Sequence, residues 1–309
     1  MITTVTMNAS LDKAYFMKSR IVNGTVMRLD SCRTSAGGKG VNVARAAALC
    51  GAKVQATGLT GGFNGQQLEA LLDKDGIAHQ FVHIAGETRC CINIMDQEYG
   101  STEYLEPGCE VSADEEQQFM QRYPQIIRDS DVVTISGSLP QGVRKDIYGR
   151  MTAIARDMGK AVILDTSGEP LKQGIKSHPT MVKPNQDEIE QLFGVKIYHM
   201  QNVIRYAGKL WDMGIPYVVI SLGKDGALLV SEDGIFRGRP PEVEAVNTVG
   251  CGDSMVGAFA AALERRYEAK DALRYAVSVA SANAMSPNTG DFDPKSIESL
   301  SARATVEQL

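Results

Sequence analysis

The sequence predicts an α/β fold in three layers, with helices on both faces of a mostly parallel central sheet and a small β-sheet lid beside it. Three observations lead to this prediction. Short apolar runs alternate with longer helical patterns almost throughout the chain. Two helical patterns near the end are apolar nearly all round, as buried helices are. Two other segments break the alternation with short, polar-alternating strands.

The alternation predicts core strands at Ile2–Met7, Lys53–Leu59, Asp131–Ser136, Ala161–Asp165, Met181–Lys183 and Tyr217–Ser221. Between them, periodicity predicts helices at Gly40–Cys50, Gln66–Lys74, Ala113–Arg128, Arg144–Met158 and Ile204–Met213. Strands joined by helices are typical of βαβ units, and therefore of a parallel sheet. The two apolar helices are expected at Ser254–Glu264 and Ala272–Met285.

The segments Lys13–Arg33 and Arg89–Glu106 lack crossover helices, and we expect them to pair as a small antiparallel sheet off the core. A small sheet beside a large α/β core suggests a lid over a cleft. The chain shows no repeat, low-complexity tract or linker. We therefore expect a single domain over residues 1–309, with a lid formed by approximately 13–33 and 89–106.

Composition excludes several classes of protein. The 309 residues carry a formal net charge of −5, which disfavours a broad nucleic-acid-binding face. No apolar run is long enough to span a membrane. The six cysteines show no C-x-x-C spacing, which favours free thiols in a reducing cytoplasm. His79 and His83 lie on an extended segment, about 13 Å apart, which disfavours a metal site there.

The strongest local motif is the glycine-rich turn Thr248–Ser254, directly before an apolar helix. Glycines at a helix start let backbone N–H groups converge on an anion, and the helix dipole adds partial positive charge. Asp253 lies in this turn, where a carboxylate is awkward beside a phosphate. Its presence is explained if it takes the proton of an attacking hydroxyl group during phosphoryl transfer. Alternatively, Asp253 only pairs with the helix dipole.

A second glycine-rich motif, Ala36–Arg45, carries Lys39 between glycines. It is not a phosphate-binding P-loop, because Gly40 follows Lys39 where Ser or Thr is needed, and it lacks the dinucleotide-binding G-x-G-x-x-G context. Gly37 and Gly38 give a flexible approach to a helix. Either Lys39 meets a ligand phosphate there, or the motif is a turn with an exposed lysine.

Two further motifs follow short strands. Val182–Glu188 opens a helix, with Asn185 and Glu188 on one helical face. This pair fits a capping box, and it equally fits a site that holds hydrated magnesium. Ile135–Gly142 ends a buried strand in a Gly/Pro turn, which is where open α/β sheets bind ligands.

Taken together and in order, these motifs resemble the PfkB group of the ribokinase-like carbohydrate kinases. The resemblance spans nearly the whole chain and rests on Asn8 and Asp12, Gly37–Asn42, Gly137–Pro140, Lys183–Glu188 and Gly250–Asp253. It implies a ribokinase-like core with a small lid. Lys39 and the pair Thr88-Arg89 look most like 1-phosphofructokinases and tagatose-6-phosphate kinases, because kinases for uncharged acceptors would not need these cations.

The resemblance also implies roles for the matching residues. Asp253 would be the general base, with an anion hole made by the amides of Gly250, Cys251 and Gly252. Magnesium would be held, through water, by Glu188 and Asn185, and the ATP phosphates would be approached by Lys183. The sugar would be bound by Asp12, Gly38, Lys39 and Asn42, and its phosphate by Arg89, helped by Arg28 and Ser138. The nucleotide would contact Ser221, Leu222, Gly223 and Asn283. Cys251 stands where the family usually has Ala.

The sequence therefore predicts ATP- and Mg²⁺-dependent phosphorylation of a ketohexose phosphate to a bisphosphate, by an enzyme of the 1-phosphofructokinase or tagatose-6-phosphate kinase type. Family lids often pair between subunits, so the resemblance also implies a homodimer through the lid. One alternative is a kinase for an unphosphorylated sugar or a nucleoside in the same family. Another is a sugar-phosphate-binding regulator without catalysis, which would not require Asp253 or Glu188.

Overall fold

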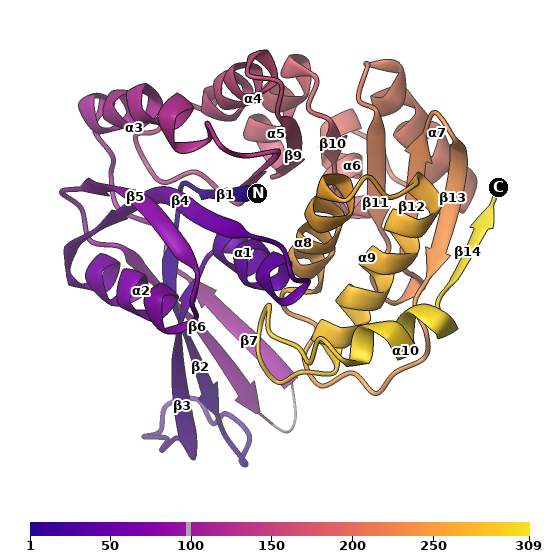
Figure 1. Ribbon diagram of the computed structural model, residues 1–309. Coiled ribbons are helices and arrows are strands. Elements are labelled where there is room, and N and C mark those ends of the chain that lie inside the picture. Colours follow the sequence, from indigo (N-terminus) through magenta and orange to yellow (C-terminus); the bar gives the residue numbers. More distant parts are fainter. Residues whose placement is uncertain (97–99) are drawn as a thin grey trace.

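The computed structural model describes residues 1–96 and 100–309. Within these residues, a ten-stranded sheet forms the middle layer between two layers of helices, and a separate four-stranded sheet projects from it, at the bottom of Figure 1. The predicted fold class, a three-layer α/β core plus a small sheet, is confirmed.

The large sheet has the strand order β14-β13-β12-β11-β10-β9-β8-β1-β4-β5. Its parallel part comprises β1 (Ile2–Thr6), β4 (Val54–Gly61), β5 (Ala78–Ile84), β8 (Val132–Ser136), β9 (Ala161–Asp165), β10 (Met181–Val182) and β11 (Tyr217–Ser221). An antiparallel edge that the sequence did not predict adds β12 (Ala227–Ser231), β13 (Gly234–Arg239) and β14 (Thr305–Gln308).

Each face of the large sheet has its own apolar core. One core lies under α1 (Lys39–Leu49), α2 (Gly62–Lys74), α8 (Cys251–Glu264), α9 (Ala269–Ala284) and α10 (Ser296–Arg303). The other lies under α3 (Ala113–Ile126), α4 (Ile147–Asp157), α5 (Gly168–Gly174), α6 (Gln186–Phe193) and α7 (Met200–Asp212).

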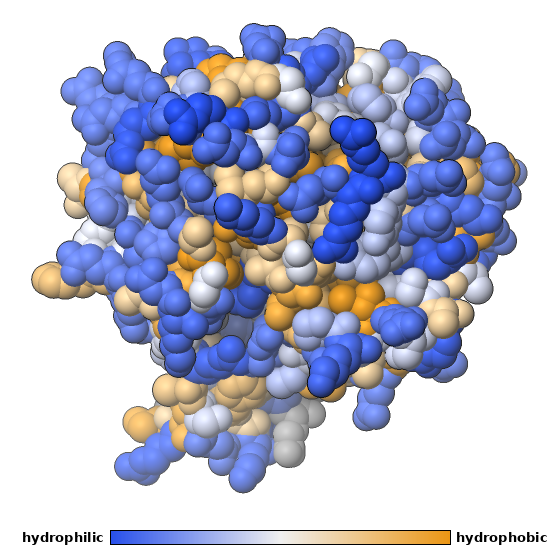
Figure 2. Space-filling view, viewed as in Figure 1, coloured by the Kyte–Doolittle hydropathy of each residue, from blue (hydrophilic) through white to orange (hydrophobic). Residues whose placement is uncertain are grey.

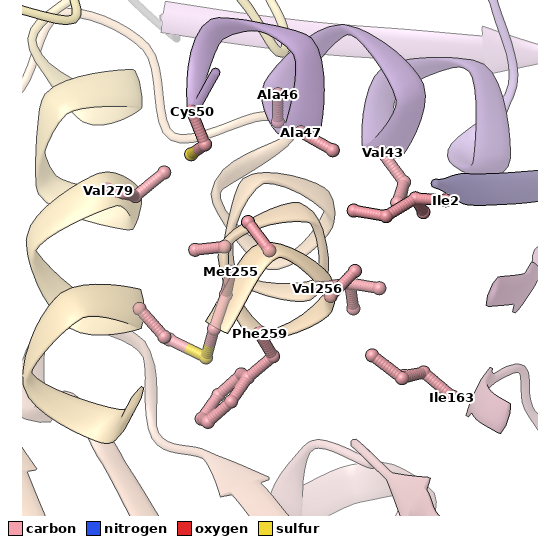
Figure 3. Close-up of a cluster of buried hydrophobic side chains, with 14 of the residues drawn as sticks. Ile2, Val43, Ala46, Ala47, Cys50, Ile163, Met255, Val256, Phe259 and Val279 are labelled. Atoms are coloured by element: carbon pink, nitrogen blue, oxygen red, sulfur yellow. The ribbon is translucent and has the colours of Figure 1, made fainter. Parts of the chain in front are cut away.

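Helix α8 is buried along most of its length between α1, α9 and the sheet, as its apolar sequence predicted. Figure 3 shows Val256 pointing toward Ile2 and Ile163. The contact with α1 is close: a Cβ atom added to Gly257 would lie 2.9 Å from both the Cβ atom of Ala46 and the amide nitrogen of Ala47. Only glycine permits this approach.

The small sheet has the order β3-β2-β6-β7, with β2 at Ser10–Phe16, β3 at Ser31–Gly37, β6 at Arg89–Asp96 and β7 at Gly100–Leu105. The sequence suggested a wholly antiparallel sheet. In the structure, however, β2 and β6 pair in parallel, beginning with the opposed residues Ser10 and Arg89. Strand β2 follows β1 and strand β6 follows β5, and both of these run in the same direction in the large sheet. The strands that continue them therefore leave the core in the same direction.

All six cysteines are free thiols, as the sequence predicted. In the described part of the chain, no helix combines the length and the apolar character needed to cross a membrane.

Candidate active site

A cavity of about 390 Å³ lies where the inner face of the small sheet meets the first turns of α1 and α8. Most of the residues that the sequence singled out line this cavity: Asp12, Gly38, Lys39, Asn42, Arg89, Lys183, Asn185, Glu188, Ser221, Gly250, Gly252 and Asp253. Segments that are distant in sequence therefore bring acidic side chains, basic side chains and helix-start amides to the same cavity.

Six predicted residues do not line the cavity: Arg28, Ser138, Leu222, Gly223, Cys251 and Asn283. Arg28 is exposed in the loop between β2 and β3, and Ser138 uses its hydroxyl group to accept a 3.2 Å hydrogen bond from Asn8 Nδ2. Gly223, with Leu222, borders a neighbouring hollow that shares Asn185 and Ser221 with the main cavity. Cys251 is half-buried beside the cavity.

Asn283 is the clearest departure from the sequence interpretation, because it is fully buried in α9. Its Nδ2 atom donates to the Val249 carbonyl at 3.0 Å, and its Oδ1 atom accepts from the Gly290 amide at 2.8 Å and the Ser254 hydroxyl at 3.1 Å. With these polar atoms engaged, Asn283 supports the turn before α8 and does not line the cavity.

The buried Asp253 carboxylate lies in the first turn of α8. Its Oδ2 atom accepts a 3.0 Å hydrogen bond from Asn42 Nδ2 in the first turn of α1. Burial raises the pKa of Asp253, and the nearby Lys39 and the Asn42 hydrogen bond oppose that rise. A carboxylate with an elevated pKa and one oxygen left for another partner suits a general base.

The turn before α8 depends on Gly250, which has a φ of 80°. A Cβ atom there would also lie 2.5 Å from Thr289 Cγ2, so no other residue fits. The Cys251 amide donates to the Thr248 carbonyl at 3.3 Å. Within the described chain, the amides of Gly250 and Gly252 have no backbone or side-chain acceptor. The structure thus leaves two of the three predicted anion-hole amides open, since Cys251 is already bonded.

Asp165, at the end of β9, is a site residue that sequence reasoning missed. Its carboxylate is almost wholly buried, with Lys183 Nζ 3.3 Å from Oδ1 and Lys39 Nζ 3.2 Å from Oδ2. Although burial alone would raise the pKa of Asp165, attraction to Lys183 and Lys39 lowers it. Asp165 in turn raises the pKa of Lys39, which keeps Lys39 charged beside Asp253.

Asp12 and Arg89 form the small-sheet side of the cavity. Ser10 Oγ donates to Asp12 Oδ1 at 2.6 Å, and burial raises the pKa of Asp12. A Cβ atom on Gly37 would lie 2.0 Å from Asp12 Cγ, so this glycine makes room for the carboxylate. The Arg89 guanidinium donates to the Asn8 carbonyl at 3.0 Å and the Glu106 carbonyl at 2.7 Å, which fixes its position.

The cavity is cationic although the whole chain is acidic. Four acidic residues line it, namely Asp12, Glu103, Glu188 and Asp253, against six basic ones, namely Lys13, Arg33, Lys39, Arg45, Arg89 and Lys183. Lys13 and Arg33 were not predicted, since they belong to no recognised motif. Arg45 was not predicted either, because the sequence indicated no role for it although it ends the motif Ala36–Arg45. Such a lining suits an anionic ligand.

Asn185 and Glu188 form the capping box of α6. The Glu188 amide donates to Asn185 Oδ1 at 2.8 Å, and the Asn185 amide donates to Glu188 Oε2 at 2.9 Å. Among the described residues, no cluster of three or more His, Cys, Asp or Glu residues could hold a metal. The Glu188 carboxylate, one of the four on the cavity wall, fits a magnesium ion that keeps its waters and binds mainly to nucleotide phosphates.

Comparison with known proteins agrees with this geometry. Residues 5–296 match the family described as pfkB family carbohydrate kinase. A tagatose-6-phosphate kinase of Staphylococcus epidermidis is 33% identical over 312 residues, which cover all of both chains. The crystal structure of phosphofructokinase-2 from Escherichia coli with potassium has a TM-score of 0.91 at 30% identity, covering 97% of this chain and 98% of that one. A protein of Thermotoga maritima, described as a possible 1-phosphofructokinase, has a TM-score of 0.88 at 27% identity, covering 100% and 99%.

We predict that Asp165→Asn destabilises the fold strongly. The substitution keeps the shape of the side chain but leaves Lys183 without its buried counter-charge, a loss of about 3–5 kcal/mol. The control is Asp291→Asn, whose pair with Arg33 spans 3.7 Å between half-exposed side chains and should contribute below about 1 kcal/mol. Urea unfolding at neutral pH measures both, and equal losses would contradict the role given to Asp165.

Proposed function

Because the chain belongs to the pfkB family of carbohydrate kinases, we propose that it transfers the γ-phosphoryl group of ATP to a ketohexose phosphate, giving a bisphosphate. The observation that carries this proposal is the placement of Asp253. Its buried carboxylate lies at the anion-binding start of α8, near Lys39 on one side and the small-sheet side of the cavity on the other.

In this mechanism Asp253 receives the proton of the acceptor hydroxyl group. Asn42 holds Oδ2, so Oδ1 is the atom left to face the acceptor. As the proton leaves, the acceptor oxygen forms a bond to the γ-phosphorus, and the bond between that phosphorus and the bridging oxygen of ADP breaks. A positioned base of this kind needs no covalent intermediate with the protein.

Three kinds of group would stabilise the transferring phosphoryl group. The open amides of Gly250 and Gly252 and the positive end of α8 offer backbone donors. Lys39 and Lys183 add charge, with their positions set by Asp165. Glu188 and Asn185 would hold hydrated Mg²⁺, which supplies further neutralisation of the phosphates when bound.

An acceptor that already carries a phosphate explains the basic side chains on the small-sheet side. Without an anion, Arg89 is bonded to carbonyl groups near Asp12, and Lys39 is paired with Asp165 near Asp253 and Glu188. A bound phosphate balances them, and arginine offers it a planar fork of donors. The tagatose-6-phosphate and fructose-phosphate kinases among the relatives support an acceptor of this class.

We also propose that the small sheet is a lid and the contact between two copies of the chain. Apolar side chains are exposed on it and on its connecting loop, with fractional exposures of 92% for Val26, 59% for Tyr104 and 64% for Leu105. Figure 2 shows apolar residues among polar ones on the projecting sheet. Exposed apolar side chains and free strand edges on a small sheet favour pairing with another copy.

The proposed reaction is tested by incubating the protein with ATP, Mg²⁺ and a panel of ketohexose monophosphates and free sugars. We expect ADP release with one sugar phosphate, little with free fructose or ribose, and none when Mg²⁺ is omitted. Asp253→Asn should slow turnover by roughly 10²–10⁴ while both substrates still bind. Near-normal turnover in folded Asp253→Asn protein would remove Asp253 from the mechanism.

Arg89→Lys tests the phosphate on the acceptor. It keeps the charge but loses the fork of donors, so KM for the sugar phosphate should rise at least about tenfold, the effect of about 1.4 kcal/mol. KM for ATP should barely change. Arg239→Lys, in a surface pair with Glu307, is the control and should leave both constants as they are. A silent Arg89→Lys variant, together with efficient phosphorylation of a free sugar, would favour an uncharged acceptor.

The dimer is tested by sedimentation equilibrium at micromolar concentration. We expect two copies in the parent protein and a shift toward monomer in Val26→Glu, because a charge would be buried in the contact. Tyr198→Glu places the same charge at another exposed apolar residue, between α6 and α7, and should leave the dimer intact. A parent protein that sediments as a monomer rules the contact out without affecting the kinase proposal.

A further inference from the structure

We propose that Arg45 is a positioning residue for the general base: its guanidinium fixes the orientation of the Asn42 amide, and the amide in turn holds the Asp253 carboxylate. The inference rests on the proposed kinase function, in which Asp253 accepts the proton. It adds a residue that ends the glycine-rich motif Ala36–Arg45 but to which the sequence assigned no role.

Arg45 lies in α1, one turn after Asn42, with only 9% of its surface exposed. Its Nη1 atom donates to Asn42 Oδ1 at 3.3 Å and to the Thr289 carbonyl at 3.4 Å. Its Nη2 atom donates to the Ala36 carbonyl at 2.8 Å, and its Nε atom donates to Asp75 Oδ2 at 3.2 Å. Four of its five N–H groups are thus committed within the protein, so Arg45 is not free to grip a phosphate as Arg89 is proposed to do.

A primary amide can present its two ends in either order, and the neighbours decide which order holds. The guanidinium has only donors, so Asn42 must turn its oxygen toward Arg45. The amino group then faces Asp253, where it donates to Oδ2 at 3.0 Å. In the reversed order, donors would meet at Arg45 and two acceptor oxygens would meet at Asp253, inside a buried site where both mismatches are costly.

Asp75 fixes the outer end of Arg45. This aspartate is the residue that ends α2, and about a third of its side chain is exposed. Its contact with Nε sets the rotation of the guanidinium plane, and the bonds to Ala36 and Thr289 hold that plane from the other side. A continuous series of polar contacts therefore runs from the end of α2, through α1, to the base at the start of α8.

The orientation of Asn42 matters for the charge as well as for the position of Asp253. Burial raises the pKa of Asp253, and the Asn42 hydrogen bond lowers it. The other ionisable groups that act on Asp253 or are acted on by it are Asp12, Lys39, Glu103, Asp165, Lys183 and Cys251. Arg45→Gln leaves all of these in place, so release of the amide should raise the pKa of Asp253 further.

The test is steady-state kinetics on Arg45→Gln, whose side chain accepts as well as donates and so permits both amide orientations. We expect kcat to fall roughly ten- to a hundredfold, the range of a hydrogen bond to a charged group. KM for either substrate should change little, and the acidic limb of the kcat/KM profile should move to higher pH. Arg45→Lys, which presents only donors to Asn42, should recover part of kcat.

A double-mutant comparison separates positioning from mere support of the fold. In an Asn42→Ala background, Arg45→Gln should lower kcat no further, because the amide through which it acts is gone. The matched control is Arg265→Gln. It removes an arginine that donates to the Cys50 carbonyl at the C-terminal end of α1, the helix that carries Asn42 and Arg45. It should lower the melting temperature without moving kcat or the pH profile.

If Arg45→Gln does not fold, Asp75→Asn gives a milder change, which should lower kcat and shift the pH limb in the same directions by less. The inference is overturned if the parent is an active kinase and both Arg45→Gln and Asp75→Asn alter only the melting temperature, or if Arg45→Gln lowers kcat equally with and without Asn42. A parent that phosphorylates nothing in the panel would instead overturn the proposed function itself.

Discussion

The close packing of α1 against α8 is the constraint on which the rest of the site depends. Both helices begin in a glycine turn at the same end of the large sheet, and Gly257 lets their axes approach until backbone meets side chain. Their first turns then lie close enough for Asn42 to bond Asp253. A larger residue at Gly257 would push the helices apart one turn after Asp253, and it would thereby separate the base from the amide that holds it. The burial of α8 therefore also serves the site. A helix exposed on one side could shift relative to α1 and move Asp253 away from Asn42.

The electrostatics of the cavity follow from how its inner charged groups are bonded within the protein. Asp165 binds two lysines at once, and Arg89 and Arg45 are held by carbonyl groups and Asp75. Groups fixed in this way keep their positions when a charged ligand enters, so little reorganisation opposes binding. The same arrangement sets Lys39 and Lys183 beside both carboxylates, those of Asp165 and Asp253. Balanced charges, and not a single strong pair, make this environment tolerable inside the protein.

Much of this was predictable from sequence because the signals were local. Periodicity located β9 and β11 to the residue, and the glycine turns identified Lys39 and Asp253. Features that depend on contacts between residues distant in sequence were not predicted. Asp165 simply ends a strand, and nothing nearby in sequence shows that two lysines will meet it. Arg45 lies in an alanine-rich helix, where its burial is visible only once Thr289 and Asp75 are placed beside it. Asn283 was placed near the nucleotide by the family resemblance, whereas its buried side chain is bonded to Val249 and Gly290.

The order in which segments contribute to the cavity has an evolutionary consequence. Residues on the small-sheet side come from the first 105 positions, whereas those around the start of α8 and the capping box of α6 come from positions 183–289. On the proposed function, acceptor recognition by the small sheet and phosphoryl donation are thus encoded in separate stretches of the gene, except that Lys39 and Asn42 serve the reaction from the early stretch. Drift or recombination in the early stretch can explore new sugars while the late stretch preserves the reaction. A family built on this plan can diversify its substrates without reinventing its chemistry.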